Sequence, residues 1–150
     1  MPQSLAKLYV HMIFSTKNRE SLLDRDIQTE LASYLGGTLN HLDCQPIEIG
    51  GTRDHIHILC CLSKNLSMSK VIEEIKSSSS KWIKPKEPRL AQFHWQSGYG
   101  AFSVSQSHLN AAIRYICQQE EHHRKVTFQE EFREFLKKYR VPYDERYVWD

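Results

Sequence analysis

Hydrophobic and polar side chains alternate along residues 5–16, the first regular pattern in the chain. A period of two residues is typical of a β-strand with one face in a core. The period changes after Asp24, which is placed to cap a helix. Hydrophobic residues then recur at helical spacing as far as His41, so a helix is predicted there.

Two further strands are predicted at residues 45–49 and 53–61, joined as a hairpin by a turn at Gly50-Gly51. Ser67 is then a candidate N-cap for a helix that runs to Ile83, where two nearby prolines end it.

The second half of the chain repeats the mixture of strands and helices. Short strands are predicted at residues 92–96 and 100–104, a helix from Leu109 to about His123, and a final helix over residues 128–139. The aromatic and charged tail, residues 141–150, is expected to dock on the rest of the protein.

Hairpins interleaved with helices are typical of the α+β class, and we expect one antiparallel sheet with helices covering one face. The chain has 150 residues, of which 40% are hydrophobic and 25% charged, so it can bury one core. A single domain over residues 1–150 is therefore predicted.

Composition excludes some classes of protein and leaves others open. The chain has no run of about 18 apolar residues and no signal-peptide pattern at its start, so we expect a cytoplasmic protein without a membrane span. Four cysteines, two of them adjacent, do not make a disulfide framework in a chain of this length. The formal net charge of +2 neither supports nor excludes a nucleic-acid partner.

His55 and His57 share one face of the strand predicted at residues 53–61, because alternate residues of a strand point the same way. Their Cα atoms would lie roughly 7 Å apart, so the two imidazoles can converge on one metal ion or one phosphate. The chain has eight histidines, and the same pattern also suits exposed or hydrogen-bonded histidines without a function.

A second polar group lies on the helix predicted after Leu109. Tyr115, Gln119 and His122 fall on one stripe beside the hydrophobic side of that helix. A phenol and an amide one turn apart can act on a common ligand, although a half-buried tyrosine beside a surface glutamine gives the same pattern.

The segment Asp54-His55-Ile56-His57, followed by Tyr115-Ile116 and Gln119, resembles the single-tyrosine HUH transposases of small bacterial insertion sequences, the TnpA type, and their REP-associated relatives. HUH denotes histidine, a hydrophobic residue and histidine. Further matching segments are VHMIFSTKNR, FHWQSGYGAFSVS and QEEHHRKVTFQEEFREFL, which follow in the expected order over nearly the whole chain.

The resemblance implies a ferredoxin-like (RRM-like) HUH fold and a DNA strand transferase. Tyr115 would attack a phosphodiester of single-stranded DNA, leaving a 5′-phosphotyrosine and a free 3′-OH, and a second 3′-OH would then rejoin the strands. It also implies recognition of a DNA hairpin, and a homodimer in which the Tyr115 helix of one subunit completes the site of the other.

The metal ligands that the resemblance implies are His55, His57 and Gln119. Nitrogen and amide-oxygen ligands with open positions suit Mg²⁺ or Mn²⁺ better than a closed zinc site. Cys60 should face away from the histidines and Cys61 should lie about 13 Å from His57 along a regular strand, so neither is expected to share their ion.

Several basic and aromatic residues are candidate DNA contacts, through phosphate binding or base stacking. Solvated charge and core packing are the competing explanations. The candidates are Lys17, Arg19, Lys76, Lys81, Lys84, Lys86, Arg89, Trp82, Trp95, Tyr99 and Phe102.

Three other functions share parts of this pattern. One is a catalytically silent regulator that binds a DNA hairpin, and another is a replication-initiator or relaxase nickase with the same chemistry. A third is a metal-binding or phosphoesterase domain in which His55 and His57 act without Tyr115. A covalent DNA adduct at Tyr115 separates the nucleophilic functions from the others.

Overall fold

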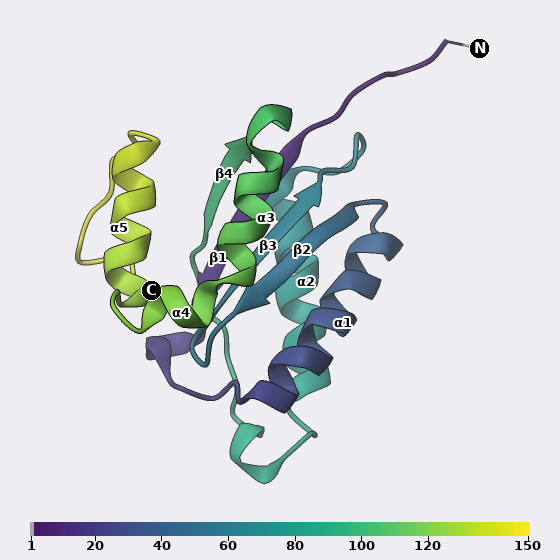
Figure 1. Cartoon of the computed structure of the whole chain (residues 1–150). Helices are drawn as coiled ribbons and strands as arrows, with labels where there is room; N and C mark the ends of the chain where they lie inside the picture. Colours follow the sequence, from purple (N-terminus) through teal and green to yellow (C-terminus); the bar gives the residue numbers. More distant parts are fainter. Residues whose placement is uncertain (1) are drawn as a thin grey trace.

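The computed structural model describes residues 2–150 and contains a four-stranded antiparallel sheet with strand order β2-β3-β1-β4 (Figure 1). The central strands are β1, Tyr9–Ser15, and β3, His55–Cys61, which pair directly. The edge strands are β2, Gln45–Gly51, and β4, Gly100–Val104. The α+β class and the antiparallel sheet predicted from the sequence are confirmed.

One face of the sheet packs against α1, Arg25–His41, and α2, Met68–Ile83 (Figure 1). Met12 and Ile58 from the central strands lie in this core with side chains of both helices. Both helices begin where the sequence predicted, because the side chain of Asp24 accepts a hydrogen bond from the Ile27 N–H and that of Ser67 one from the Lys70 N–H.

The opposite face of the sheet is also covered, by α3, Leu109–Cys117, α4, Gln119–His123, and α5, Phe128–Lys138. The expectation of a sheet covered on one face is therefore wrong. The physical reason is that the second face carries its own buried apolar group, which α5 completes. This second core contains Ile13, Phe102, Phe128, Phe132 and Leu136.

Three predicted elements differ from the structure. The first strand begins at Tyr9 rather than Leu5, because Leu5 lies outside the sheet and is 86% exposed. The hairpin turn lies after Gly51, because Gly50 and Gly51 belong to β2 and pair with β3. Residues 92–96 form no strand, and only an isolated bridge joins Trp95 to Thr16.

The helix predicted from Leu109 to His123 breaks at Gln118, which separates α3 from α4. Short 3-10 turns lie at Lys17–Arg19, Pro88–Leu90 and Gln106–His108. No helix in residues 2–150 is long and apolar enough to cross a membrane.

The tail docks, as the sequence predicted, and it runs back beside α5 (Figure 1). Arg133 of α5 forms an ion pair with Glu145 at 2.6 Å. The Trp149 ring lies near Phe132, and the guanidinium groups of Arg19 and Arg133 lie 5.8 and 5.0 Å from its centre. The Arg133 and Phe132 contacts hold the tail against α5, and the Arg19 contact joins the tail to the segment after β1.

Gly50 allows α3 to lie close against the edge strand. A Cβ atom on Gly50 would lie 2.8 Å from the carbonyl oxygen of Ile116 and 3.0 Å from its Cγ2. The first of these atoms belongs to helix backbone, so the helix itself would have to move. Tyr115 is the neighbour of Ile116, so this glycine also determines where the tyrosine lies.

The Gly50→Ala substitution is therefore expected to lower the free energy of unfolding by about 1–3 kcal/mol through overpacking. Urea unfolding measures the change. Gly37→Ala is the matched control, because Gly37 lies in α1 with nothing within 4 Å of its added Cβ. That control should raise stability by about 0.5–1 kcal/mol, through helix propensity. Equal effects of the two substitutions would contradict the close approach of α3.

Candidate metal and nucleophile site

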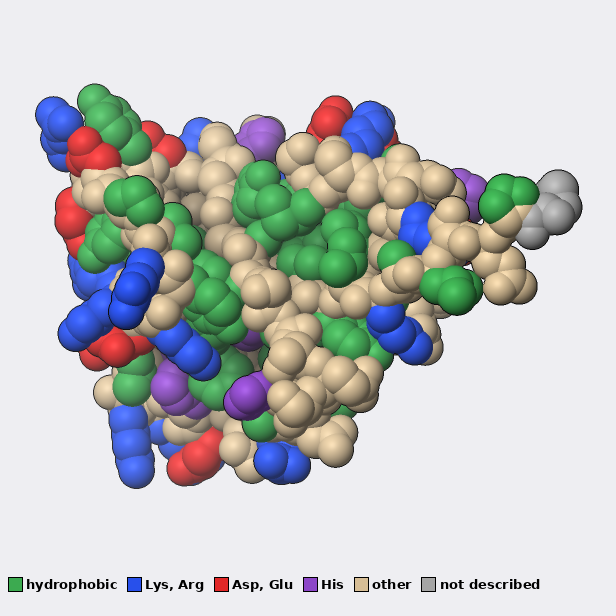
Figure 2. Space-filling model, turned by 90° about the horizontal axis from the view of Figure 1, so that it is seen from above, with side chains coloured by type: hydrophobic (Ala, Val, Ile, Leu, Met, Phe, Trp, Pro, Cys, Tyr) green, Lys and Arg blue, Asp and Glu red, His purple; other side chains and the backbone are tan. Residues whose placement is uncertain are grey.

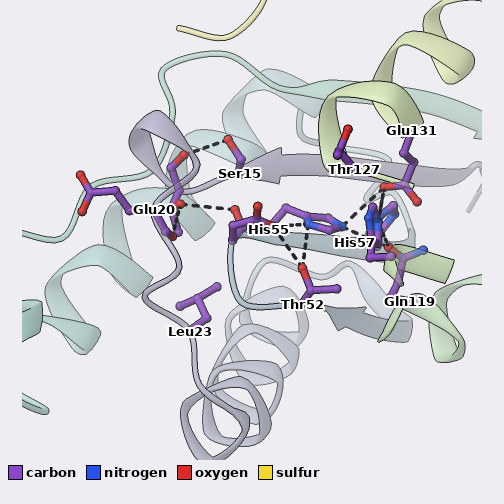
Figure 3. A network of polar contacts seen from close by, with 12 residues as sticks. Ser15, Glu20, Leu23, Thr52, His55, His57, Gln119, Thr127 and Glu131 are labelled. Carbon is purple, nitrogen blue, oxygen red and sulfur yellow. Dashed lines mark hydrogen bonds and ion pairs between the residues drawn. The ribbon is translucent and has the colours of Figure 1, made fainter. Parts of the chain in front are cut away.

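His55 and His57 lie side by side on β3, on the sheet face that α3, α4 and α5 cover (Figure 3). Both are buried, with 1% and 0% of their surface exposed. Their ring centres are 5.1 Å apart. The strand therefore places two imidazoles toward one point, as the alternation of side chains predicted.

The break at Gln118 places Gln119 at the start of α4 with its side chain directed at the histidines. Gln119 Oε1 lies 3.1 Å from His55 Nε2 (Figure 3). The structure thus brings together the three residues that the family resemblance implied as metal ligands, His55, His57 and Gln119. All three belong to the same chain.

Tyr115 lies beside this group, half-buried at the end of α3. Its ring centre is 5.9 Å from that of His57, and its hydroxyl lies 3.3 Å from His122 Nε2. The hydroxyl also donates a hydrogen bond to the carboxylate of Glu131. Tyr115 is therefore adjacent to the cluster, and Glu131 connects the two.

Glu131, on α5, is the site residue that the sequence analysis missed (Figure 3). It is 3% exposed, and its Oε1 lies 3.0 Å from His57 Nε2 and 3.1 Å from His123 Nε2. One signal was present in the sequence. Glu131 falls at i+3 after Phe128, on the hydrophobic stripe of α5, where a carboxylate needs a buried partner.

The histidine nitrogens that face the cluster are acceptors when their rings are neutral. His55 Nδ1 donates to Asp54 Oδ1 at 2.7 Å, and His123 Nδ1 donates to the Val126 carbonyl at 2.6 Å. These bonds put the proton of each neutral ring on Nδ1 and direct the Nε2 lone pair inward. The lone pairs face Gln119 Oε1 and Glu131 Oε1, which are acceptors as well.

These converging nitrogen and oxygen atoms need positive charge at their centre, which protons on the histidines or a divalent cation can supply. A ligand atom from each of His55, His57, His123 and Glu131 lies within 4.8 Å of the others. Imidazole nitrogens, one carboxylate and one amide oxygen form a donor set suited to a divalent cation. The residues present therefore fit the metal centre expected from the sequence, with Glu131 and His123 as two additional candidate ligands.

Hydrogen bonding and burial shift the pKa values of the groups in this cluster in different directions. Burial disfavours charge on His55, but bonds to Asp54 and Glu131 outweigh it and raise the pKa of His55 to about 9. A protonated His55 thus supplies positive charge next to Glu131. Burial opposes ionisation of Glu131, but its polar contacts with His123, His55 and His57 outweigh burial and hold its pKa well below the ordinary value. Burial and the nearby Glu131 raise the pKa of Tyr115, so the phenol stays protonated in this arrangement.

The His57 ring contacts a further buried histidine, His11, on the neighbouring strand β1. Burial lowers the pKa of His57 to about 4 despite the nearby Glu131. Burial, followed by the charge of His57, lowers the pKa of His11 to about 3. Both rings are therefore neutral near pH 7.

These lowered pKa values predict that the metal-free protein loses stability between the ordinary histidine pKa of 6.5 and about pH 5. Over this range His11 and His57 take up protons in the unfolded chain and stay neutral in the folded one. Because the unfolded state binds more protons, the free energy of unfolding should fall by about 1.4 kcal/mol per pH unit for each ring.

Urea unfolding with a chelator present, at about pH 7 and about pH 5, measures this slope. The variant His57→Gln should retain only the share that His11 contributes. Equal unfolding free energies of the native chain at the two pH values would contradict the prediction.

The candidate DNA contacts lie in different environments. Lys76 is half-buried, and its Nζ donates to the carbonyls of Gln96 at 2.8 Å and Gly98 at 2.6 Å. Burial lowers the pKa of Lys76 to about 8. Arg89 is ion-paired with Glu87 at 2.6 Å and with Asp24 at 2.8 Å. These two residues have structural contacts that compete with DNA binding.

The remaining basic candidates differ in exposure. Lys17 and Lys81 are exposed, whereas Lys84 donates to Ser80 Oγ at 3.0 Å and Arg19 lies over Trp149. On the face seen in Figure 2, Lys and Arg side chains are intermixed with Asp and Glu at the end that holds α5. That end of the face is therefore not a continuous basic surface.

The aromatic candidates divide between surface and core. Trp82 stacks on Tyr34 with ring centres 4.9 Å apart, and Lys86 Nζ lies 4.4 Å from the centre of the Trp82 ring. Tyr99 is 37% exposed. Trp95 and Phe102 are buried in the two cores, so packing explains both.

Comparison with known proteins identifies a family. The family described as "transposase IS200 like" matches residues 4–119, which contain His55, His57, Tyr115 and Gln119. Glu131 and α5 lie beyond the matched range. No curated protein matches the chain.

Two solved structures share the fold. One is a protein from Deinococcus radiodurans R1 named as a candidate transposase, with a TM-score of 0.62 and 22% identity over 79% of this chain and 98% of that one. The other is a REP-associated tyrosine transposase bound to a REP hairpin, with a TM-score of 0.61 and 16% identity over 84% of this chain and 74% of that one.

Proposed function

Because the chain belongs to the IS200-like transposase family, we propose that it cleaves and rejoins single-stranded DNA through a covalent bond between the DNA and Tyr115. The observation that supports this most strongly is the position of the Tyr115 hydroxyl, beside a buried cluster of histidine, glutamine and glutamate suited to a divalent cation. The proposed enzyme is a tyrosine HUH strand transferase, with residues 1–150 as its single domain.

In the proposed reaction the Tyr115 oxygen forms a bond to phosphorus, and the bond from phosphorus to the 3′ oxygen breaks. The phenolic proton passes to a nearby base, and the leaving 3′ oxygen takes up a proton from that base or from water to become a free 3′-OH. Glu131 and His122 are the side chains within hydrogen-bond reach of that proton. Attack by a second 3′-OH on the phosphotyrosine reverses the bond changes and rejoins the strands.

His55, His57 and Gln119 would hold Mg²⁺ or Mn²⁺, together with Glu131 and His123. When bound, such a cation supplies Lewis-acid stabilisation of charge on the phosphate oxygens. The protein residues contribute fixed positions, since an aligned nucleophile and phosphate can lower the barrier by roughly 7–11 kcal/mol.

DNA can reach this site only after a change in structure. His55, His57 and Gln119 are each no more than 1% exposed. The Tyr115 hydroxyl is already hydrogen-bonded to Glu131. We propose that Tyr115 and Glu131 Oε2 separate when a phosphate enters, while Glu131 Oε1 stays beside His57 and His123.

The partners proposed are single-stranded DNA with a hairpin and a second copy of the chain. Within one chain Gln119 Oε1 lies 3.1 Å from His55 Nε2, and the ring centres of Tyr115 and His57 lie 5.9 Å apart. The proposed homodimer would make the same contacts between subunits, and the mass of the protein in solution tests it. Such an enzyme would act in the cytoplasm, bound to the nucleoid.

A cleavage assay with two labels tests the proposed function. Hairpin DNA from the flanks of the gene, labelled at either its 5′ or its 3′ end, is incubated with Mn²⁺ or Mg²⁺ and run on a denaturing gel. The 3′-labelled part should migrate with the protein, whereas the 5′-labelled part should appear as a short free strand. An added oligonucleotide with a free 3′-OH should become joined to the 3′-labelled part.

Other results would identify the alternatives. Hairpin binding without cleavage would indicate a catalytically silent regulator and contradict the enzyme. Cleavage with an adduct but without rejoining would indicate a nickase of the replication-initiator type. Metal-dependent hydrolysis that leaves no adduct would indicate a phosphoesterase.

A further inference from the structure

His11 is a buried polar residue that the proposed reaction does not use. It lies on β1, is 3% exposed, and its Nε2 is 2.7 Å from Nδ1 of His57. The edge of the Phe135 ring faces its ring at 5.2 Å between centres. Burying the His11 imidazole in this apolar setting is unfavourable unless the ring is hydrogen-bonded. The partner that the structure gives it is His57.

The two central histidines are supported in different ways. His55 Nδ1 contacts Asp54 Oδ1 at 2.7 Å and Thr52 Oγ1 at 3.0 Å (Figure 3). A carboxylate can only accept, so it holds the His55 proton on Nδ1 permanently. His57 Nδ1 instead contacts His11, which can either donate or accept at the same nitrogen.

His57 needs a neighbour that can donate to its Nδ1 in one state and accept from its Nδ1 in the other. In the structure its Nε2 lies 3.0 Å from Glu131 Oε1, so the neutral ring carries its proton on Nε2 and accepts from His11 Nε2–H at Nδ1. A neutral imidazole can bind a cation through Nε2 only if its proton is on Nδ1. His11 Nε2 must then accept that proton's hydrogen bond.

We propose that His11 is a positioning residue that stabilises either tautomer of His57 and so allows its Nε2 to change from donor to metal ligand. This rests on the proposed function of the cluster. In the change each ring keeps one proton: His57 moves its proton from Nε2 to Nδ1, and His11 moves its own from Nε2 to Nδ1. The change therefore creates no charge in the buried pair, where a charge would be costly.

Two substitutions separate this role from simple packing. His11→Phe keeps a ring beside Phe135 but removes the hydrogen bond, whereas His11→Gln keeps a group that can donate or accept after an amide flip. Mn²⁺ affinity, measured from the electron paramagnetic resonance of free Mn²⁺, should fall about 10–100-fold in His11→Phe, a typical loss when the partner of a metal-binding histidine is removed. His11→Gln should restore most of that affinity.

The tautomer itself can be observed without any substitution. Nitrogen-15 spectra of the histidines should show the protons of His57 and His11 on Nε2 in the metal-free chain, and both on Nδ1 after Mg²⁺ is added. If His11 served only for packing, its own proton would stay on Nε2 while that of His57 changed nitrogen. This measurement still decides the matter if His11→Phe does not fold.

Three outcomes would overturn the inference. A folded His11→Phe that binds Mn²⁺ as tightly as the native chain would do so and leave the proposed function intact, as would a His11 proton that stays on Nε2 while the His57 proton moves to Nδ1 in Mg²⁺. If the native chain binds neither Mn²⁺ nor Mg²⁺, the metal centre of the proposed function fails together with the role of His11.

Discussion

The Tyr115→Phe variant is expected to lose DNA cleavage by at least about 10³-fold, since loss of a catalytic nucleophile typically costs that much or more. The change removes one oxygen atom and leaves the ring beside His57 and Phe135. Glu131 keeps its histidine neighbours, so the fold and the metal centre should survive. Single-turnover cleavage of hairpin DNA measures the loss.

Tyr147→Phe is the matched control, because Tyr147 is 63% exposed in the tail. It should cleave at the native rate. If Tyr115→Phe retained a tenth or more of the activity, another nucleophile would have to be present and the proposed reaction would be wrong.

The second large effect is expected from His57→Ala, which removes a nitrogen from the centre of the cluster. Mn²⁺ affinity should fall by at least about 100-fold, and the cleavage rate should fall with it. The reason is that a residue that binds the metal directly contributes at least as much affinity as the groups hydrogen-bonded to it. The cluster would keep His55, Gln119, His123 and Glu131. Calorimetric titration with Mn²⁺ and the cleavage assay measure the two losses.

His41→Ala serves as its control, because His41 is exposed at the end of α1, outside the cluster. Native affinity and activity are expected for it. Undiminished Mn²⁺ binding by folded His57→Ala would exclude this cluster as the metal site.

The sequence predicted the parts of this site that depend on local periodicity. Two histidines two residues apart on a strand must share a face. Helical spacing also grouped Tyr115 with Gln119, although the break at Gln118 is what directs Gln119 at the histidines. The caps at Asp24 and Ser67 were equally local, since each side chain bonds a nearby N–H. These features need no knowledge of which elements meet.

Contacts between distant elements could not be obtained in this way. His11 meets His57 only because β1 and β3 are neighbours, with Leu59 opposite His11 in the register. Glu131 reaches the histidines only because the tail and the second core hold α5 over that face. Periodicity gives the direction of each side chain but leaves the pairing of elements open.

The errors in the predicted elements have the same origin. Residues 92–96 have the composition of a strand, but their backbone pairing is limited to one isolated bridge, from Trp95 to Thr16 beyond the end of β1. Gly50 and Gly51 have the composition of a turn, but close packing against Ile116 requires a glycine within β2. In both places tertiary contacts outweigh the local preference.

The central claim is that Tyr115 forms the covalent bond to DNA. The most direct test is to isolate the adduct formed with hairpin DNA and Mn²⁺, digest both components, and locate the attached nucleotide by mass spectrometry. The account predicts a 5′-phosphate on the peptide that contains Tyr115. An adduct on any other residue, or DNA cut without an attached peptide, would contradict it.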